Sequence, residues 1–271
     1  MEKILYVSDL DGTLLNNDVK LSEFTKEAIN SLMQRGMIFS FATARSNHTG
    51  TKVSKGITPK VPIIIYNGTF IYDVASGKRV ASNLFQRENA QKILDRLLKN
   101  GTFPMVHAFL NEKEKYIYDE KHMSRGMADF QATRVHDERR MSVDVYDLEG
   151  LEVFYFTCID DMDRLLPLYN EFKDEFQCLF TKDIYSGDYW LEILPNNATK
   201  AKAVQELKKL LGCTKVVCFG DGTNDIEMFK YADESYAVSN AHPELKKYAT
   251  AIIDSNENDG VAKWLLENYK A

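Results

Sequence analysis

The chain has 271 residues, of which 44% are hydrophobic and 27% are charged, and its formal net charge is −6 at pH 7. This composition is typical of a globular protein, and the acidic balance argues against a nucleic-acid binder, because phosphate contacts require a basic face. No run of apolar residues is long enough to predict a membrane span. The N-terminus enters a strand without a charged-then-apolar leader, so we expect a cytoplasmic protein.

The four cysteines form no C-x-x-C pair and two of them lie in apolar runs, which predicts reduced, mostly buried thiols. The five scattered histidines show none of the spacings that are typical of zinc ligands.

The first eighty residues alternate between strands and helices. Apolar runs predict strands over residues 4–8, 37–43 and 63–66, and an amphipathic helix begins after Ser22 and ends before Gly36. Asn67 and Gly68 then predict a tight turn into residues 69–72. This alternation indicates a parallel sheet with helices on both faces.

From about residue 84 the pattern changes. A helix over 88–100 is followed by closely spaced strands rich in aromatic and β-branched residues, which indicates an α+β insertion with its own sheet. Strand–helix alternation resumes near Trp190. We therefore predict an α/β fold with a doubly wound, parallel-sheet, Rossmann-like core over 1–83 and 189–271, interrupted by an α+β cap domain over 84–188.

Pairs of carboxylates follow two of the predicted core strands. Asp9 and Asp11 end the first strand, two positions apart, so extended backbone aims them the same way, and Gly12 allows a sharp turn. Asp221 and Asp225 follow the strand over 216–220. The carboxyl ends of parallel strands meet at one edge of a sheet, and clustered carboxylates there suit a hard divalent cation, above all Mg²⁺, together with a phosphate.

These two segments, D-L-D-G-T and G-D-G-T-N-D, resemble motifs one and four of the haloacid dehalogenase (HAD) superfamily, and the whole chain is similar to its Cof-like sugar-phosphatase branch. The resemblance implies a Mg²⁺-dependent phosphomonoesterase that acts on a small phosphorylated metabolite. It assigns Asp9 as the nucleophile that forms a phospho-aspartate, and Asp11 as the general acid and base. It also implies that Asp9, Asp221, the backbone carbonyl of Asp11 and, directly or through water, Asp225 hold the metal.

The superfamily's second motif is a serine or threonine after the second strand, and Thr43 matches it. Its hydroxyl and the following backbone amides can donate to phosphate oxygens. Ala44 stands where relatives often have glycine, which restricts the loop but keeps the amide. Arg45 is a possible residue of the site, although an arginine at a helix start can equally pair with a carboxylate or lie in solvent.

Lys200 matches the third motif, a lysine that reaches the phosphate and the nucleophile. It begins a predicted helix, where the helix dipole disfavours a cation, so a solvated surface role explains it poorly. The resemblance also makes Asn224 a possible phosphate donor, although asparagine is equally a good helix cap. Asn67 is a possible residue of the site, or simply part of a turn.

The cap carries several aromatic residues that we interpret as its own hydrophobic core. Arg134, Arg139 and Arg140 are candidates for holding a second phosphate, but a run of charges is more often a solvated face. The sequence does not identify the substrate.

Two other functions stay open. A phosphomutase or phosphotransferase uses the same intermediate, and a non-catalytic phosphometabolite-binding protein uses the same fold. We expect no nucleic-acid or membrane partner and a monomer.

Overall fold

The computed structural model describes residues 2–183 and 186–270, and the chain divides into two compact units. The core unit combines Met1–Ser82 with Ala198–Ala271, and the cap unit is Asn83–Asn197. The core is therefore discontinuous in sequence, as the pattern of strands and helices predicts.

The core is built on a parallel sheet with the strand order β14-β13-β12-β1-β2. These strands are Ala251–Ile253, Glu234–Val238, Lys215–Gly220, Ile4–Ser8 and Ile38–Phe41. The central strand β1 is almost entirely buried and pairs in parallel with β12 on one side and with β2 on the other. Near-continuous apolar runs at β1 and β12 thus form the middle of a sheet that is covered on both faces.

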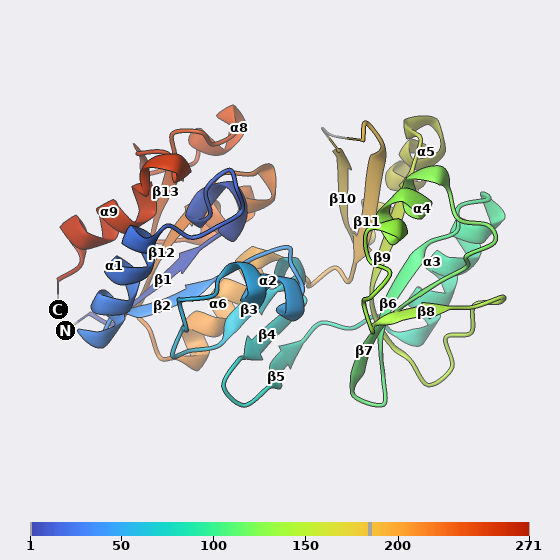
Figure 1. Cartoon of the computed structure of the whole chain (residues 1–271), viewed down its shortest axis with the longest axis horizontal. Helices are drawn as coiled ribbons and strands as arrows, with labels where there is room; N and C mark the ends of the chain where they lie inside the picture. Colours follow the sequence, from blue (N-terminus) through green and yellow to red (C-terminus); the bar gives the residue numbers. More distant parts are fainter. Residues whose placement is uncertain (1, 184–185, 271) are drawn as a thin grey trace. The chain divides into compact units, whose positions relative to one another are not determined.

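Helices cover both faces of this sheet (Figure 1). On one face α1 and α9 pack side by side, and on the other α6 packs against α7. The core helices are α1 Glu23–Gln34, α2 Asn47–Val53, α6 Lys200–Leu210, α7 Ile226–Tyr231, α8 Pro243–Lys246 and α9 Gly260–Asn268. As predicted, Ser22 caps α1 by accepting a hydrogen bond from the Thr25 N–H at 2.9 Å.

A small antiparallel sheet of β3 Ile63–Ile65, β4 Phe70–Asp73 and β5 Lys78–Ser82 completes the core unit. A single parallel bridge between Ala42 and Ile64 joins it to the end of β2. Asn67 and Gly68 form the predicted turn, both with positive φ, at 53° and 97°. The strand β5 was not predicted, because its sequence K-R-V-A-S is mostly polar and contains no apolar run, as fits a strand that is nowhere fully buried.

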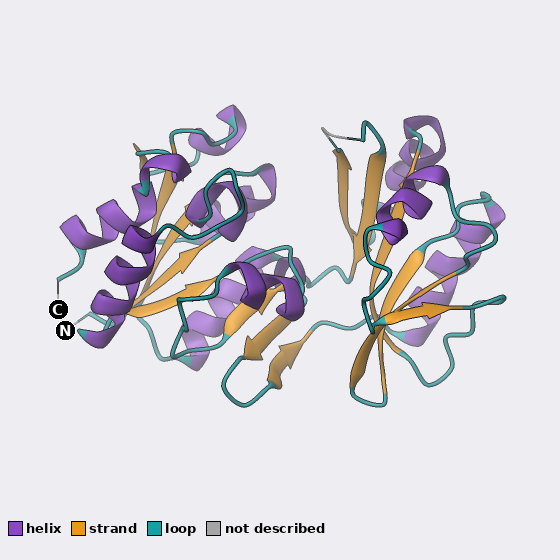
Figure 2. Cartoon of the chain, in the orientation of Figure 1, coloured by secondary structure: helices purple, strands orange, loops and turns teal. Residues whose placement is uncertain are grey.

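The cap unit is a six-stranded sheet with helices on both faces (Figure 2). The strand order is β10-β11-β9-β6-β7-β8, and every pairing is antiparallel except that of β7 with β8. The strands are β6 Met105–Leu110, β7 Lys113–Tyr118, β8 Arg140–Ser142, β9 Glu152–Asp160, β10 Gln177–Lys182 and β11 Tyr189–Leu194, and the helices are α3 Arg87–Lys99, α4 Arg125–Ala132 and α5 Met162–Phe172.

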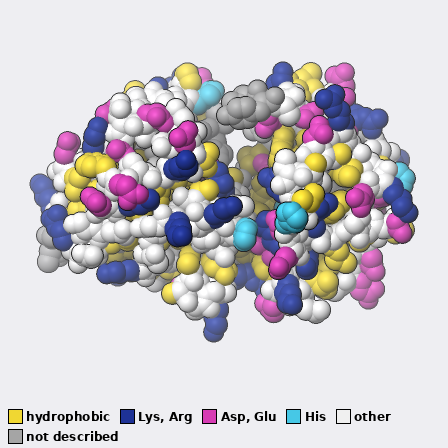
Figure 3. All heavy atoms as spheres, viewed as in Figure 1, with side chains coloured by type: hydrophobic (Ala, Val, Ile, Leu, Met, Phe, Trp, Pro, Cys, Tyr) yellow, Lys and Arg dark blue, Asp and Glu magenta, His cyan; other side chains and the backbone are white. Residues whose placement is uncertain are grey.

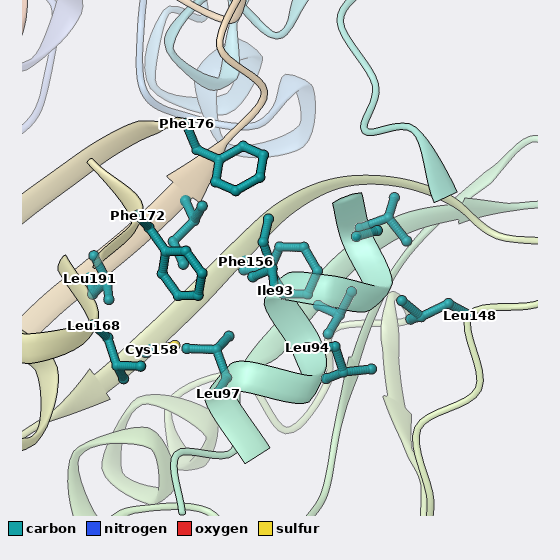
Figure 4. Close-up of a cluster of buried hydrophobic side chains, with 14 of the residues drawn as sticks. Ile93, Leu94, Leu97, Leu148, Phe156, Cys158, Leu168, Phe172, Phe176 and Leu191 are labelled. Atoms are coloured by element: carbon teal, nitrogen blue, oxygen red, sulfur yellow. The ribbon is translucent and has the colours of Figure 1, made fainter. Parts of the chain in front are cut away.

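The cap has its own hydrophobic core, in which α3 and α5 pack on one face of the sheet (Figure 4). Leu94 and Leu97 from α3 and Phe172 from α5 meet Phe156 and Cys158 from β9. The opposite face carries a smaller cluster under α4, which includes Met105, Tyr116, Tyr118, Met127 and Ile159. Consecutive side chains of β9, such as Cys158 and Ile159, thus belong to different clusters.

The end of the cap differs from the sequence-based boundary at residues 188 and 189. We placed the strand near Trp190 in the second part of the core, but β11 pairs with β9 and with β10 inside the cap sheet. The cap unit accordingly extends to Asn197. An apolar strand looks alike in either sheet, and only its pairing partners decide the assignment.

Among the described residues, no helix is both long enough and apolar enough to cross a membrane. All four cysteines are free, three of them buried and Cys178 partly so. On the face drawn in Figure 3, acidic and basic side chains are interspersed rather than gathered by sign.

Candidate active site

The candidate nucleophile Asp9 comes directly after β1 and is 5% exposed. Its backbone N–H donates to the Phe219 carbonyl at 2.9 Å, which ties the end of β1 to the end of β12. The chain then turns through Leu10–Leu14, where Gly12 has a φ of 73°. A Cβ atom on Gly12 would overlap the carboxylate of Asp221, so glycine is required for both conformation and space.

The carboxylates after β12 are held by hydrogen bonds from the backbone and from a threonine. Asp221 Oδ1 accepts from the Thr13 hydroxyl at 2.8 Å. Asp225 is completely buried, and its Oδ2 accepts from the N–H groups of Asp221 and Gly222, both at 3.1 Å. Gly220 completes this packing, since a Cβ there would overlap Asp225.

Lys200 joins the two strand ends. Its ammonium donates to Asp9 Oδ1 at 2.6 Å and to Asp225 Oδ1 at 2.8 Å, and the residue is only 3% exposed. Thr199 caps the helix α6 that begins at Lys200, and its backbone lies so close to Gly68 that a Cβ on this glycine would overlap it. The misplaced charge noted in the sequence is therefore a buried cation between two carboxylates.

Asp9, Asp221 and Asp225 bring three carboxylates close to a single cation, Lys200, and the repulsion among these carboxylates affects the pKa values of Asp9 and Asp221. Burial raises the pKa of Asp9 well above its usual value, and the charges of Asp225 and Asp221 raise it further against the opposing effect of Lys200. Burial and Asp225 likewise raise the pKa of Asp221, to about 6. Burial alone would lower the pKa of Lys200, but Asp225 and Asp9 outweigh it and raise that pKa.

The donor set fits a hard divalent cation. Asp9, Asp221 and Asp225 each offer a carboxylate oxygen, and these oxygens lie within 4.8 Å of one another. All three donors are oxygen atoms, which Mg²⁺ and Ca²⁺ prefer, and a cation would relieve the repulsion that raises the pKa values of Asp9 and Asp221. The residues present therefore could hold a metal ion.

The residues after β2 form a loop with an available donor. Thr43 is fully buried, and its hydroxyl accepts from the Arg45 N–H at 3.1 Å. Within the described part of the chain, the N–H of Ala44 donates to no protein group, and Ala44 is exposed. This amide is thus available to donate to a ligand oxygen, and its predicted role as a phosphate donor stays a prediction.

Arg45 holds Asp11. Its Nε donates to Asp11 Oδ2 at 2.7 Å and its Nη2 to Asp11 Oδ1 at 2.6 Å, so both carboxylate oxygens are engaged. The hydrogen bond to Asp11 raises the pKa of the Arg45 guanidinium. Sequence reasoning left three alternatives for Arg45: a place in the site, pairing with a carboxylate, or solvent. In the structure Arg45 pairs with a carboxylate, and this carboxylate belongs to the candidate site residue Asp11.

Two predicted asparagines also meet in the core unit. Asn224 Nδ2 donates to Asn67 Oδ1 at 3.4 Å, a long contact, and Asn67 is 5% exposed. The structure thus gathers the candidate site residues around the ends of β1, β2, β3 and β12. Sequence reasoning missed two contacts. Thr13 orients Asp221, and the side-chain amide of Asn240 donates to the Gly12 carbonyl at 2.8 Å. The only sequence signals for these contacts are the D-G-T segment that contains Thr13 and the S-N-A-H segment that contains Asn240.

The core unit is thus a parallel α/β fold with an acidic centre at its strand ends, and an inserted α+β unit divides it in sequence. A family model described as haloacid dehalogenase-like hydrolase matches residues 6–265, so the chain belongs to this family.

Relatives in sequence and structure agree with this membership. The chain is 29% identical to the 5-amino-6-(5-phospho-D-ribitylamino)uracil phosphatase YwtE of Bacillus subtilis, over 95% of each chain. It resembles TM0651 from Thermotoga maritima with a TM-score of 0.80 at 25% identity, covering 100% of this chain and 98% of the other. A haloacid dehalogenase-like hydrolase from Bacteroides thetaiotaomicron shares the fold, with a TM-score of 0.80 at 22% identity, covering 99% and 100% of the two chains. The expected class, a HAD-type phosphatase of the Cof-like branch, is confirmed.

Proposed function

We propose that the protein is a Mg²⁺-dependent phosphomonoesterase that works through a phospho-aspartate on Asp9. The observation that carries this proposal is the position of Lys200, which bridges Asp9 and Asp225 in a buried site beside Asp221. A buried lysine at the nucleophile offsets the repulsion between a carboxylate and a phosphate dianion. When bound, the metal ion adds further charge compensation and aligns the phosphoryl group.

The residues divide the reaction into two steps. A carboxylate oxygen of Asp9 attacks phosphorus, and the bond to the leaving oxygen breaks. Asp11, once it has taken up a proton from solvent, gives that proton to the departing alcohol. Asp11 then takes a proton from water, which attacks the phosphorus of the phospho-aspartate and releases inorganic phosphate and the free Asp9. Arg45 orients the Asp11 carboxyl, and Thr43, the Ala44 amide and Asn224 are the proposed donors to the phosphate.

The proposed substrate is a small phosphorylated metabolite such as a sugar or polyol phosphate. The Bacillus subtilis relative is named for a substrate that carries its phosphate on a ribityl chain, which belongs to this class. Such a substrate needs no nucleic-acid or membrane partner, and we propose a monomeric enzyme.

The test measures phosphate release from a panel of sugar and polyol phosphates with Mg²⁺ and with a chelator. We expect activity that needs the metal and that falls by more than about a thousandfold in Asp9→Asn. Asp18→Asn, which changes an exposed aspartate of the same unit, is the matched control. Equal release of phosphate and alcohol distinguishes hydrolysis from phosphoryl transfer. An Asp9→Asn enzyme that keeps more than about a tenth of the activity would contradict the assignment of the nucleophile.

A further inference from the structure

Three arginines lie on the segment of the cap that leads from α4 to β8. Two consecutive turns shape this segment: the Asp137 N–H donates to the Arg134 carbonyl at 2.9 Å, and the Arg140 N–H donates to the Asp137 carbonyl at 3.1 Å. The Tyr116 N–H donates to the carbonyl of Arg139 at 2.9 Å and so fixes the segment to β7. The arginines are therefore held in place by the backbone rather than by side-chain contacts alone.

One of the three arginines is neutralised by acidic neighbours. Arg139 donates to Asp137 through Nε at 2.9 Å and through Nη2 at 2.6 Å, and to Glu114 through Nη1 at 2.6 Å. Its guanidinium lies 5.5 Å from the centre of the Tyr116 ring. These contacts give Arg139 a structural role in joining β7 to the segment.

The other two arginines contact only neutral groups. Arg134 lies 3.5 Å from the centre of the Phe130 ring, and its Nη1 donates to the Phe130 carbonyl at 3.1 Å and to the Thr133 hydroxyl at 2.7 Å. Arg140 donates to the hydroxyl of Tyr118 through Nε at 3.1 Å and Nη2 at 2.7 Å. Across residues 2–183 and 186–270, neither guanidinium comes within 4.0 Å of a carboxylate. Both residues are half-buried, which distinguishes them from a solvated run of charges.

The cost of burying Arg134 is only partly offset by its neighbours. Burial lowers the pKa of Arg134, Tyr116 and Asp137 act in the opposite direction, and Arg139 lowers that pKa to a smaller extent. An anion that approached Arg134 would offset the cost of burying this cation.

Two tyrosine hydroxyls complete the cluster. Burial raises the pKa of Tyr116, and the charges of Arg139, Arg140 and Arg134 oppose that shift, so all three arginines act on this ring. The Tyr116 hydroxyl is buried and has no hydrogen-bond partner in the described part of the chain. The Tyr118 oxygen accepts both bonds from Arg140, which leaves its own proton to donate elsewhere.

We propose that Arg134 and Arg140, with the hydroxyls of Tyr116 and Tyr118, bind the phosphate or carboxylate group of a small organic anion. Guanidinium groups held over aromatic rings present a fixed fork of donors, which matches the paired oxygens of these groups. The anion binds within the cap unit as a small molecule of its own, so the inference does not rest on the proposed function.

The first experiment detects binding without turnover. The Nε–H signals of the arginines in full-length ¹⁵N-labelled Asp9→Asn protein are assigned by single Lys substitutions and followed during titration with inorganic phosphate and with fructose 1,6-bisphosphate. We expect the signals of Arg134 and Arg140 to shift together along one saturable curve. Arg125, which lies on α4 with a 95% exposed side chain, is the control signal. The absence of saturation below about 10 mM, or an equal shift of Arg125, overturns the site.

The second experiment tests the contribution of one arginine. It repeats the phosphate titration in Arg140→Gln and in the matched control Arg125→Gln and follows the Nε–H signal of Arg134. A fall of about tenfold in affinity for Arg140→Gln alone supports the site. An affinity that is unchanged in Arg140→Gln overturns it.

The two experiments also separate this inference from the phosphatase proposal. The shifts of the arginine signals do not depend on hydrolysis, so an inactive protein with saturable shifts contradicts only the proposed function. Arg140→Lys keeps the charge, and a melting temperature equal to that of the wild type shows that a loss of binding is not a loss of folding.

Discussion

Replacing Lys200 by methionine tests whether the buried cation stabilises the core as well as the reaction. The substitution removes the ammonium that bridges Asp9 and Asp225 and leaves two buried carboxylates without their cation. Methionine is similar in length and adds no charge. We therefore expect a less stable core, even though the variant buries more apolar surface.

The expected loss follows from the burial of both partners. Breaking a buried ion pair by removing one member costs roughly 3–5 kcal/mol, because the remaining charge stays uncompensated. With a urea dependence on the order of 2 kcal/mol per molar, the midpoint of unfolding should fall by about 1.5–2.5 M. The pKa of Asp9 is already raised, so in the variant the folded chain binds a proton that the unfolded chain releases. Stability should therefore recover in part as the pH falls from about 8 to about 5.

The assay is urea unfolding in the absence of divalent metal, read from the fluorescence of the core alone. The chain has two tryptophans: Trp264 packs against Phe219 and Tyr236 in the core, whereas Trp190 lies in the cap. A Trp190→Phe background thus makes the signal specific to the core unit.

The double variant Lys200→Met with Asp225→Asn supplies the control, because it removes one of the uncompensated charges and should regain part of the loss. If Lys200→Met unfolds within about 1 kcal/mol of the wild type, or if the double variant is less stable than the single one, the electrostatic account of the cluster is wrong.

Three further outcomes are expected. Gly68→Ala should lower the free energy of unfolding by about 3 kcal/mol or more and should lower kcat, because the new Cβ overlaps the backbone at the start of α6. Gly212→Ala, also at positive φ but with open space around it, should lower the free energy of unfolding by only about 1 kcal/mol. Equal losses in the two variants would contradict the overlap. Burial lowers the pKa of His107 to about 3, so near pH 6.5 the unfolded chain binds a proton that the folded cap does not bind. Lowering the pH to about 4.5 should therefore destabilise the cap by on the order of 3 kcal/mol. His107→Gln should abolish this pH dependence of unfolding, measured by Trp190 fluorescence. Arg45→Lys should lower kcat about tenfold, because one ammonium cannot hold both oxygens of Asp11, and an unchanged kcat would show that the clamp is dispensable.

The positions of the candidate residues in the core were largely predictable, because each depends on the strand or helix that directly precedes or follows it in the sequence. Asp9, Thr43 and Asp221 each follow a buried strand, and parallel strands bring their carboxyl ends to one edge whatever separates them in sequence. Lys200 was recognisable because its charge is misplaced at the start of a helix. Its two carboxylate partners could be named only through the family resemblance.

Contacts between distant segments could not be predicted. An arginine at a helix start has the same local sequence whether it lies in solvent or, like Arg45, holds Asp11 from 34 positions away. The strand β11 was assigned to the core because an apolar run does not reveal its pairing partner. Both α4 and β8 were missed because they are short, at eight and three residues, and contain few large apolar residues. The catalytic roles of the site residues stay predictions.

The split core has a consequence for synthesis on the ribosome. Strand β1 needs β12 on one side, and β12 ends at Gly220, after the whole cap has been made. The cap is one continuous stretch with its own hydrophobic core, so it can fold while the first 82 residues still lack three of the five strands of their sheet. During that interval the apolar strand β1 has an unpaired edge, so we expect the nascent N-terminal segment to be prone to association with other chains.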